Sequence, residues 1–403
     1  MTRLWEIDAT IDPRVLRFTA SGDAALDARL VPYDVRASVA HAQMLCEAGY
    51  LSKSENEAVA HELAAIADDH AHGTWAITTE DEDVHTAIEN QLTQRLGATG
   101  ARIHLGRSRN DQVLAALRLY LLDAIAVLAS GGESVLAALD AIATAQGSVV
   151  IPGYTHMQRA MPSSVQLWAE GFRSEIADDI EGLRLCRRRI SRNPLGSAAG
   201  YGVPVLRVDR WRTTELLGFD QVHEPVTAVQ LSRGKAEAEV LFSLALLLQD
   251  VGRLAAELCL FATSEFGFVK LPASVTTGSS IMPQKRNPDA LELVRASGAL
   301  ICADLLAVLQ LTCKLPSGYH RDLQLSKAPL FHGIDMARDT LEALTAVLPE
   351  VRFDAERAAL AMEPGLYAAE AAYRLVEEQG VPFRDAYRQV AAEIEAQRQR
   401  SGS

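Results

Sequence analysis

Hydrophobic residues recur at helical spacing along most of the chain. In the clearest series the members lie three or four residues apart: Val165, Trp168, Phe172, Ile176, Ile180 and Leu183. That spacing places all of these side chains on one face of a helix of about five turns. We therefore predict an amphipathic helix here, with its apolar face packed against other elements.

Two longer stretches predict long helices. Residues 111–146 carry a continuous apolar stripe that contains Gly131 and Gly132, and we expect the helix to kink or break at these glycines. Residues 235–266 are apolar on nearly every side and are much longer than a buried strand. They predict a helix that is enclosed by other helices, which implies a thick bundle.

The rest of the pattern also favours helices. Residues 289–312 and 334–348 show helical periodicity, whereas the strict alternation that is typical of strands is nearly absent. Stretches rich in Gly, Pro, Ser and Thr separate the long helices at residues 147–162, 193–204, 271–288 and 315–329. We predict an all-α fold in which these four stretches are loops that carry the polar chemistry.

Composition narrows the function classes. Of the 403 residues, 48% are hydrophobic and 23% are charged, and the formal charge of −13 argues against nucleic acid as a main partner. The most apolar run, residues 240–248, is about half as long as a membrane span. The five cysteines occur singly, and residues 1–15 lack the apolar stretch of a signal peptide. We expect a cytoplasmic protein with reduced thiols and with no metal, nucleic acid or membrane contact.

One predicted loop stands out by its chemistry. Residues 278–288, Gly-Ser-Ser-Ile-Met-Pro-Gln-Lys-Arg-Asn-Pro, place two hydroxyls, a lysine and an amide in a segment too rich in Gly and Pro for a helix. Successive backbone N–H groups in such a loop form a concavity for an anion, and Lys285 adds a positive charge. On these residues alone, a helix-entry loop with a serine cap remains the alternative.

This loop resembles the signature G-S-S-x-x-P-x-K-x-N-P of the fumarase/aspartase superfamily. Further stretches resemble segments of one member, the argininosuccinate lyase family: G-R-S-R-N-D-Q at 106–112, G-Y-T-H-M-Q-R-A at 153–160, D-E-D-V-H at 81–85, and L-P-S-G-Y at 315–319 with Asp322, Gln324 and Lys327 after it. The resemblance spans about residues 20–350. It therefore covers most of the chain.

The resemblance implies a three-domain, fumarase/aspartase-like fold. We place the domains at residues 1–105, 106–350 and 351–403, with a central bundle of long helices and a shortened third domain. It also implies a homotetramer in which each active site is assembled from three subunits. The apolar segment 235–266 favours such an assembly, because one chain of long, thin helices covers it poorly.

Members of this family split argininosuccinate into arginine and fumarate, and the resemblance implies that reaction here without a cofactor. It assigns Ser279 as the base that removes a proton beside a carboxylate, and Lys285 as the cation that stabilises the resulting charge. It assigns His156 as the acid that protonates the departing nitrogen, with Glu292 as its carboxylate partner. On the residues alone, His156 is a structural histidine and Glu292 a favourable first-turn carboxylate.

The resemblance also implies ligand contacts. The matching positions for the succinyl part and for the remainder of the ligand are Ser108, Arg109, Asn110, Thr155, Asn287, Tyr319, Gln324 and Lys327. Asp83 and Asp27 are expected to face cationic parts of the ligand. For Asp27, a solvated surface carboxylate is an equal interpretation.

Several positions depart from the commoner family pattern. Asp23 stands near the usual position of a ligand-contacting serine, His320-Arg321 replaces Asn-Lys, and Leu325-Ser326 replaces an acidic pair. These changes concern the leaving-group side, so they bear on the identity of the substrate. One alternative is a related lyase that releases fumarate from another N-substituted aspartate. A second, of a different class, is a non-catalytic structural protein like the crystallins recruited from this family.

Overall fold

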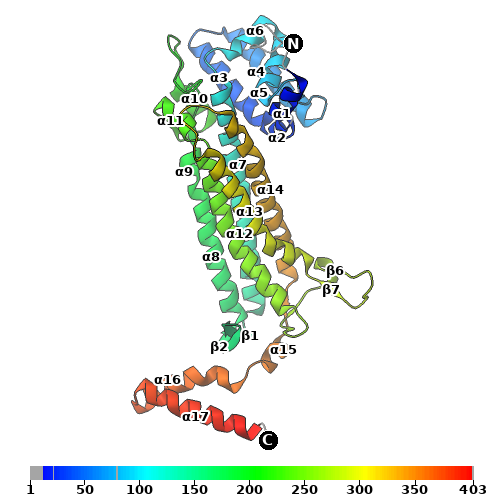
Figure 1. Ribbon diagram of the computed structural model, residues 1–403, viewed down its shortest axis with the longest axis vertical. Coiled ribbons are helices and arrows are strands. Elements are labelled where there is room, and N and C mark those ends of the chain that lie inside the picture. Colours follow the sequence, from blue (N-terminus) through cyan, green and yellow to red (C-terminus); the bar gives the residue numbers. More distant parts are fainter. Residues whose placement is uncertain (1–11, 21, 79, 402–403) are drawn as a thin grey trace. The chain divides into compact units, whose positions relative to one another are not determined.

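The computed structural model describes residues 12–20, 22–78 and 80–401, and these residues are mostly helical (Figure 1). The predicted all-α class is confirmed. Residues 1–11, on which much of the signal-peptide interpretation rests, lie outside the described residues. The chain divides into two compact units: unit 1 is Met1–Val127, Gly182–Leu244 and Ile301–Asp335, and unit 2 is Leu128–Glu181, Ala245–Leu300 and Met336–Ser403. The three-domain division stays a prediction.

The first part of unit 1 is a group of short and medium helices. They are α1 (Pro13–Ala20), α2 (Asp23–Asp27), α3 (Val31–Glu47), α4 (Lys53–Ala71), α5 (Val84–Leu96), α6 (Ala98–Ala101) and the start of α7 (Arg109–Gln146). A capping box begins α4: the Ser52 hydroxyl accepts the Glu55 backbone N–H, and the Glu55 carboxylate accepts that of Ser52. Asp83 caps α5 by accepting the Thr86 N–H at 2.9 Å, which fixes this carboxylate at the helix entrance.

The remainder of unit 1 holds the start of α7 in place. It contains α9 (Arg187–Ile190), β3 (Arg192–Asn193), α10 (Arg210–Leu217), β4 (Gln221–Val222), α11 (Val226–Leu231) and the 3-10 helix η4 (Arg321–Ser326). The buried carboxylate of Asp111 accepts backbone N–H groups from Ser108, Gly196 and Ala198 at 2.8–2.9 Å. These bonds anchor the 106–112 segment to the loop before α10 and so fix the direction of its side chains.

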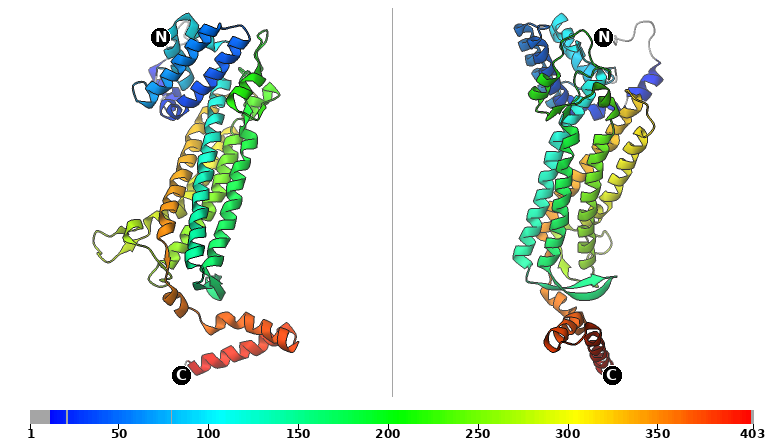
Figure 2. Two further views of the ribbon diagram at one scale, coloured as in Figure 1. Left: turned by 180° about the vertical axis from the view of Figure 1, so that it is seen from behind. Right: turned by 90° about the vertical axis from the view of Figure 1, so that its left-hand side faces the viewer.

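Unit 2 contains most of the strands and the carboxyl-terminal helices. Its elements include β1 (Val150–Thr155), β2 (Gln158–Ser164), β5 (Val269–Lys270), β6 (Thr277–Gly278), β7 (Arg286–Asn287), β8 (Arg352–Phe353), α15 (Ala355–Leu360), α16 (Ala368–Gln379) and α17 (Phe383–Ser401). The long helices α7, α8 (Val165–Leu185), α12 (Lys235–Phe261), α13 (Asp289–Thr312) and α14 (Lys327–Val347) contribute residues to both units. In unit 2 their segments lie side by side (Figures 1 and 2).

The long helices follow the hydrophobic pattern closely. The predicted stripe on α8 is buried apart from Phe172, which is half-buried. Helix α13 has the predicted bounds, and α12 ends at Phe261, before the predicted end. Helix α14 begins at Lys327, earlier than predicted, because Pro329 lies in the first helical turn, where proline is tolerated.

Helix α7 runs without a break through Gly131 and Gly132, so the predicted break there is wrong. A Cβ atom at Gly132 would lie 2.7 Å from the side chain of Ile180 on α8, and one at Gly131 would lie 3.4 Å from Leu341 on α14. The glycines therefore allow close helix packing. By length and composition α7 is the one described helix that could span a membrane, and 56% of its most apolar window is buried, as in a bundle core.

The segment predicted as the loop 147–162 is largely a β-hairpin. Strands β1 and β2 pair antiparallel, with His156 and Met157 between them at φ angles of 53° and 59°. Such a turn usually contains Asn-Gly or Asp-Gly, so the sequence carried no hairpin signal. A second short ladder joins Thr277 to Asn287 and Gly278 to Arg286, which leaves residues 279–285 as the tip of a closed loop.

Candidate active site

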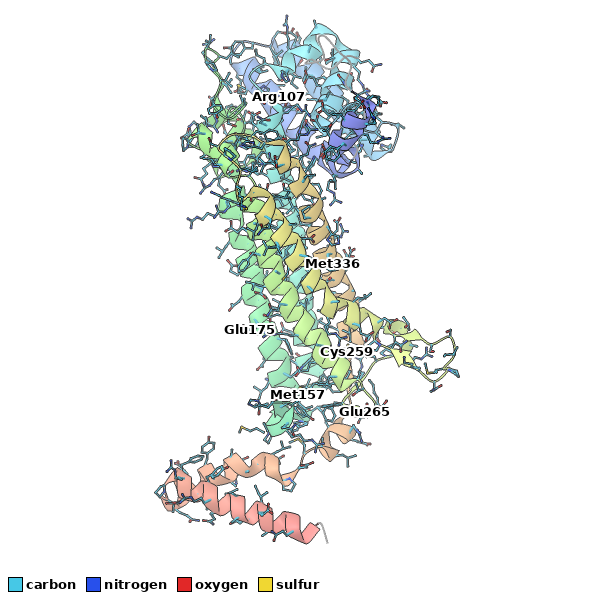
Figure 3. All side chains as sticks on the ribbon, viewed as in Figure 1. Arg107, Met157, Glu175, Cys259, Glu265 and Met336 are labelled. Atoms are coloured by element: carbon cyan, nitrogen blue, oxygen red, sulfur yellow. The ribbon has the colours of Figure 1, made fainter. Side chains whose placement is uncertain are left out.

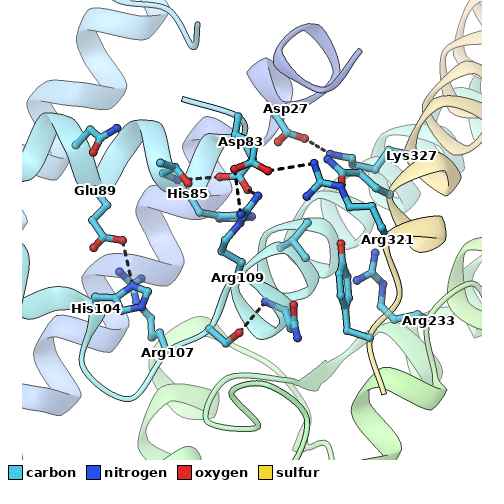
Figure 4. Close-up of a pocket in the computed structure, with 18 of the residues that line it drawn as sticks. Asp27, Asp83, His85, Glu89, His104, Arg107, Arg109, Arg233, Arg321 and Lys327 are labelled. Atoms are coloured by element: carbon cyan, nitrogen blue, oxygen red, sulfur yellow. Dashed lines mark hydrogen bonds and ion pairs between the residues drawn. The ribbon is translucent and has the colours of Figure 1, made fainter. Parts of the chain in front are cut away.

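Eight of the ten predicted ligand contacts line one cavity in unit 1. The cavity measures about 520 Å³, and these lining residues are Asp27, Asp83, Ser108, Arg109, Asn110, Tyr319, Gln324 and Lys327. They come from α2, the start of α5, the start of α7 and the segment around η4 (Figure 4). Four stretches that are separate in the sequence therefore meet at one concave surface.

Lys327 is buried between two carboxylates. Its Nζ atom lies 2.5 Å from Oδ1 of Asp27 and 3.0 Å from Oδ1 of Asp23, and all three side chains are at least nine-tenths buried. Burial alone lowers the pKa of Lys327, but the two carboxylates outweigh it and raise that pKa. Burial raises the pKa of Asp23 against the opposing effect of Lys327. Asp27 is completely buried, so its interpretation as a solvated surface carboxylate is wrong.

Arg109 forms the second charged group. One of its terminal nitrogens pairs with Asp83, and Nη1 lies 3.3 Å from Oε2 of Glu82. Burial raises the pKa of Asp83, but the nearby charges of His85 and Arg109 outweigh it and lower that pKa. Glu82 also pairs with Arg321 at 3.3 Å and has a φ of 72°, a conformation that non-glycine residues hold only where their surroundings enforce it.

Two histidines lie on the same cavity wall, although the family resemblance gave them no role. His85 donates from Nδ1 to the carboxylate of Asp34. His104 Nδ1 lies 3.0 Å from Oε2 of Glu89, and both histidines line the cavity (Figure 4). Burial lowers the pKa of His85, but Asp34 outweighs it, and the pKa is raised. The buried His85 ring is thus biased toward its protonated form by the carboxylate of Asp34.

The signature loop belongs to unit 2 and positions Ser279 by backbone hydrogen bonds. The Ser279 Oγ atom accepts the N–H groups of Ile281 at 3.3 Å and Met282 at 3.2 Å. Two donors on this oxygen favour its negatively charged form. Thr277 donates its hydroxyl to Asp289, which ties the loop to the start of α13.

A cleft of about 1040 Å³ lies beside the signature loop. Lys285, Asn287 and Glu292 line it, together with Cys259 on α12 and Glu265 just after α12 (Figure 3). Glu292 lies 3.9 Å from the guanidinium of Arg295, one turn further along α13. Lys285 and Glu292 are exposed, so this cleft is open to solvent.

His156 and Thr155 lie at the hairpin turn and are exposed. No carboxylate among the described residues pairs with His156, so a single chain does not form the predicted contact with Glu292. The positive φ of His156 is costly backbone geometry of the kind found at functional turns. The roles of Ser279, His156, Lys285 and Glu292 stay predictions.

Within the described part of the chain, no group of three or more His, Cys, Asp or Glu side chains is placed to hold a metal ion. The side chains that line the cavity and the cleft, together with Ser279 and His156, offer hydroxyl, imidazole, carboxylate and cationic groups. This set suits proton transfer and the stabilisation of anionic intermediates.

Known proteins with similar sequences identify the family of this chain. A family model described as "Lyase" matches residues 6–302. Argininosuccinate lyase of Sorangium cellulosum (strain So ce56) is 46% identical over 394 residues, which cover 98% of this chain and 91% of that protein. The chain belongs to the argininosuccinate lyase family. Another family member, argininosuccinate lyase of Xylella fastidiosa (strain 9a5c), is 43% identical over 381 residues, 94% of this chain and 85% of that one.

The fold is also shared with a solved structure, that of EDDS lyase in complex with formate. That structure superposes with a TM-score of 0.79 at 26% identity, over 100% of this chain and 80% of its own chain. The predicted fumarase/aspartase-like fold agrees with this match. The charged cavity residues that the sequence analysis did not assign include Glu82, Arg233 and Arg321. Glu82 lies inside the D-E-D-V-H segment and Arg321 was a noted departure, whereas Arg233 had no signal.

Proposed function

We propose that this chain cleaves argininosuccinate into arginine and fumarate. The observation that carries the proposal is the meeting of three family segments, around Asp83, Arg109 and Lys327, at one cavity. Cations and carboxylates both line that cavity. A ligand with several carboxylates, a guanidinium and an ammonium group requires both kinds of partner.

We assign the chemical steps to residues of unit 2. Ser279 takes the proton from the carbon beside a substrate carboxylate, and its two backbone donors support the alkoxide form that this step needs. The electron pair of the broken C–H bond first moves onto the adjacent carboxylate, which gives a doubly charged intermediate that Lys285 stabilises. The pair then forms the C=C bond of fumarate as the C–N bond breaks, and His156 gives a proton to the departing guanidinium nitrogen.

The ion pairs that already exist in the cavity support a binding role for unit 1. Lys327, Asp27, Arg109 and Asp83 are held by one another before any ligand arrives. Groups that are fixed in this way need little reorganisation when the substrate binds. The cavity is thus suited to orient a polar ligand, while Thr155 and Asn287 are assigned to its contacts from unit 2.

We also propose a homotetramer with shared active sites, located in the cytoplasm. Helix α12 exposes Phe242 and Leu246, at 53% and 42%, although the segment is apolar on nearly every side. Further exposed apolar residues lie on α8 and α13: Leu167, Leu293, Leu300, Leu306 and Leu309. Exposed apolar surface of this extent is typical of association surfaces. The five cysteines are free thiols, in keeping with a reducing compartment.

A second candidate is a lyase that acts on another N-substituted aspartate. The structural match to EDDS lyase favours it, as do the changes at Arg321, which lines the cavity, and at Asp23, which contacts the lining residue Lys327. The reaction type is the same in both cases, since fumarate remains the product. The two candidates differ only in the group that leaves.

Fumarate absorbance separates these candidates. The purified protein is incubated in turn with argininosuccinate, EDDS, adenylosuccinate and aspartate, and a Ser279→Ala variant serves as the control for contaminating lyases. We expect fumarate from argininosuccinate at the highest kcat/KM. Faster release from EDDS with none from argininosuccinate supports the second candidate, and no release from any of them contradicts both.

A further inference from the structure

The cation predicted to contact the far end of the ligand is already neutralised. Lys327 faces two buried carboxylates, Asp27 at 2.5 Å and Asp23 at 3.0 Å. A lysine has a single charge to share, so this group carries an excess of negative charge when both carboxylates are ionised. A carboxylate of the ligand gains little from Lys327 in such surroundings. It needs another positive partner in the cavity.

Arg233 is a buried cation on the same wall with unused donors (Figure 4). Its side chain is 1% exposed, and neither Nε nor Nη1 has a hydrogen-bond partner within the described residues. Its Nη2 reaches the carbonyl of Leu323 at 3.5 Å, which is the outer limit for a hydrogen bond. The guanidinium can therefore turn toward a ligand at small cost.

The charge on Arg233 is only partly balanced. Glu237 lies 3.8 Å away, from Oε1 to Nε of Arg233, and neither of its oxygens has a hydrogen-bond partner among the described residues. The same carboxylate also acts on the buried guanidinium of Arg118. One carboxylate thus serves two arginines, which leaves net positive charge beside the cavity. A bound carboxylate restores the balance.

The neighbours of Arg233 also suit the amino-acid end of the ligand, which carries a carboxylate and an ammonium group. The guanidinium carbon lies 5.9 Å from the centroid of the Tyr319 ring, and Oε1 of Gln324 is a buried acceptor without a partner in the described chain. Both residues line the cavity. Unused donors on Arg233 and an unused acceptor on Gln324 suit a carboxylate and an ammonium group, respectively.

We propose that Arg233 is a substrate-binding residue that holds the α-carboxylate of the amino-acid half of the ligand, in place of the neutralised Lys327. This inference rests on the proposed function for the identity of the ligand. It makes Arg233 a specificity residue, because a ligand without that carboxylate leaves the guanidinium unpaired. The fork of an arginine binds a planar carboxylate through two parallel hydrogen bonds, which lysine cannot reproduce.

The test compares ligands with and without the α-carboxylate. Calorimetry measures binding of L-arginine and of agmatine, and fumarate absorbance measures turnover of argininosuccinate and of its analogue made from agmatine. The variants are Arg233→Lys, which keeps a cation beside Glu237, and the double variant Arg233→Gln/Glu237→Gln, which removes both charges. The matched control is Glu237→Gln, which leaves the Arg233 fork in place.

We expect the wild type to bind L-arginine roughly tenfold to a hundredfold more tightly than agmatine. Both Arg233 variants are expected to lose most of this preference and to raise KM for argininosuccinate by a similar factor, with kcat changed little. Glu237→Gln is expected to keep the preference. An unchanged preference in folded Arg233 variants, or a wild type that binds both ligands equally or neither, overturns the proposal. Fumarate release by the wild type reports separately on the proposed function.

Discussion

The cavity of unit 1 and the signature loop of unit 2 differ in how complete they are. In unit 1, Lys327 and the carboxylate partners of Lys327 and Arg109 are buried, Arg109 itself is half-buried, and both cations are paired. Burial strengthens these contacts. In unit 2, Lys285, His156 and Glu292 are exposed, and Ser279 is held by backbone donors alone. One chain thus brings eight of the ten predicted ligand contacts to one cavity, whereas its proposed elimination residues are largely open to solvent. This difference is what the proposed sharing of active sites between copies of the chain would explain.

Removal of the proposed base is the strongest way to break this comparison. Ser279→Ala deletes the oxygen that accepts two backbone N–H groups, so we expect kcat to fall roughly a hundredfold to ten-thousandfold. Stability is expected to change little, because the loop is at the surface. Ser280→Ala, which changes the exposed neighbouring hydroxyl, is the matched control. Fumarate absorbance measures both variants, and a Ser279→Ala enzyme of normal rate removes Ser279 from the mechanism.

Two lysine substitutions sharpen the contrast between the units. Lys327→Met leaves Asp23 and Asp27 without their cation, so we expect a loss of about 3 kcal/mol in the free energy of unfolding along with weaker substrate binding. Lys285→Met, at an exposed site, is expected to lower kcat roughly a hundredfold and to leave stability within about 0.5 kcal/mol. Urea unfolding and fumarate absorbance give the two readouts. If the two variants have the same free energy of unfolding, the result contradicts the inference that Lys327 is buried and Lys285 is exposed.

A smaller effect, on stability, is expected from two neighbouring carboxylates in unit 2, Asp179 on α8 and Asp250 on α12. Burial, followed by the neighbouring Asp250, raises the pKa of Asp179 to about 7. Because the folded pKa lies above the unfolded one, the stability from this group is complete at acid pH and is lost as pH rises through 7. We expect Asp179→Asn to raise the melting temperature at pH 8 by about 2 °C.

Thermal unfolding followed by circular dichroism at pH 4 and pH 8 measures this effect. The same substitution is expected to have much less influence at pH 4, which is close to the unfolded pKa of 3.8, because the folded carboxyl is protonated there and the unfolded one is partly protonated. Asp178→Asn, at the exposed neighbouring position, is the control. A pH dependence that is the same for wild type and Asp179→Asn contradicts the role of this group.

The fold could be predicted well where helical periodicity decides it. The stripe on α8 and the bounds of α13 follow from the spacing of apolar residues. The hairpin at Thr155 and His156 could not be predicted, since its turn lacks the residues that usually allow positive φ. At Gly132 of α7 the absence of a side chain leaves room for Ile180 of α8, and tertiary contacts of this kind leave no local trace in the sequence.

The candidate site was predictable only as a set of motifs. Family resemblance assigned Asp27 and Lys327, but their pairing with each other and with Asp23 requires the folded chain. Arg233 was not predicted at all, because a single arginine forms no motif. Its burial beside the cavity is a property of the folded chain. The contact between Glu292 and His156 stays a prediction that only the assembled protein can test.

The central claim is that intact residues from the two units, on different copies of the chain, build one active site. Arg109→Lys keeps a cation for Asp83 but loses the guanidinium fork, while Ser279→Ala removes the base. Each variant alone is expected to release little fumarate from argininosuccinate. After the two are unfolded together and refolded as mixed oligomers, we predict recovery of about a quarter of the wild-type rate, since a shared site can then draw both intact residues. A mixture that is no more active than the separate variants contradicts the claim.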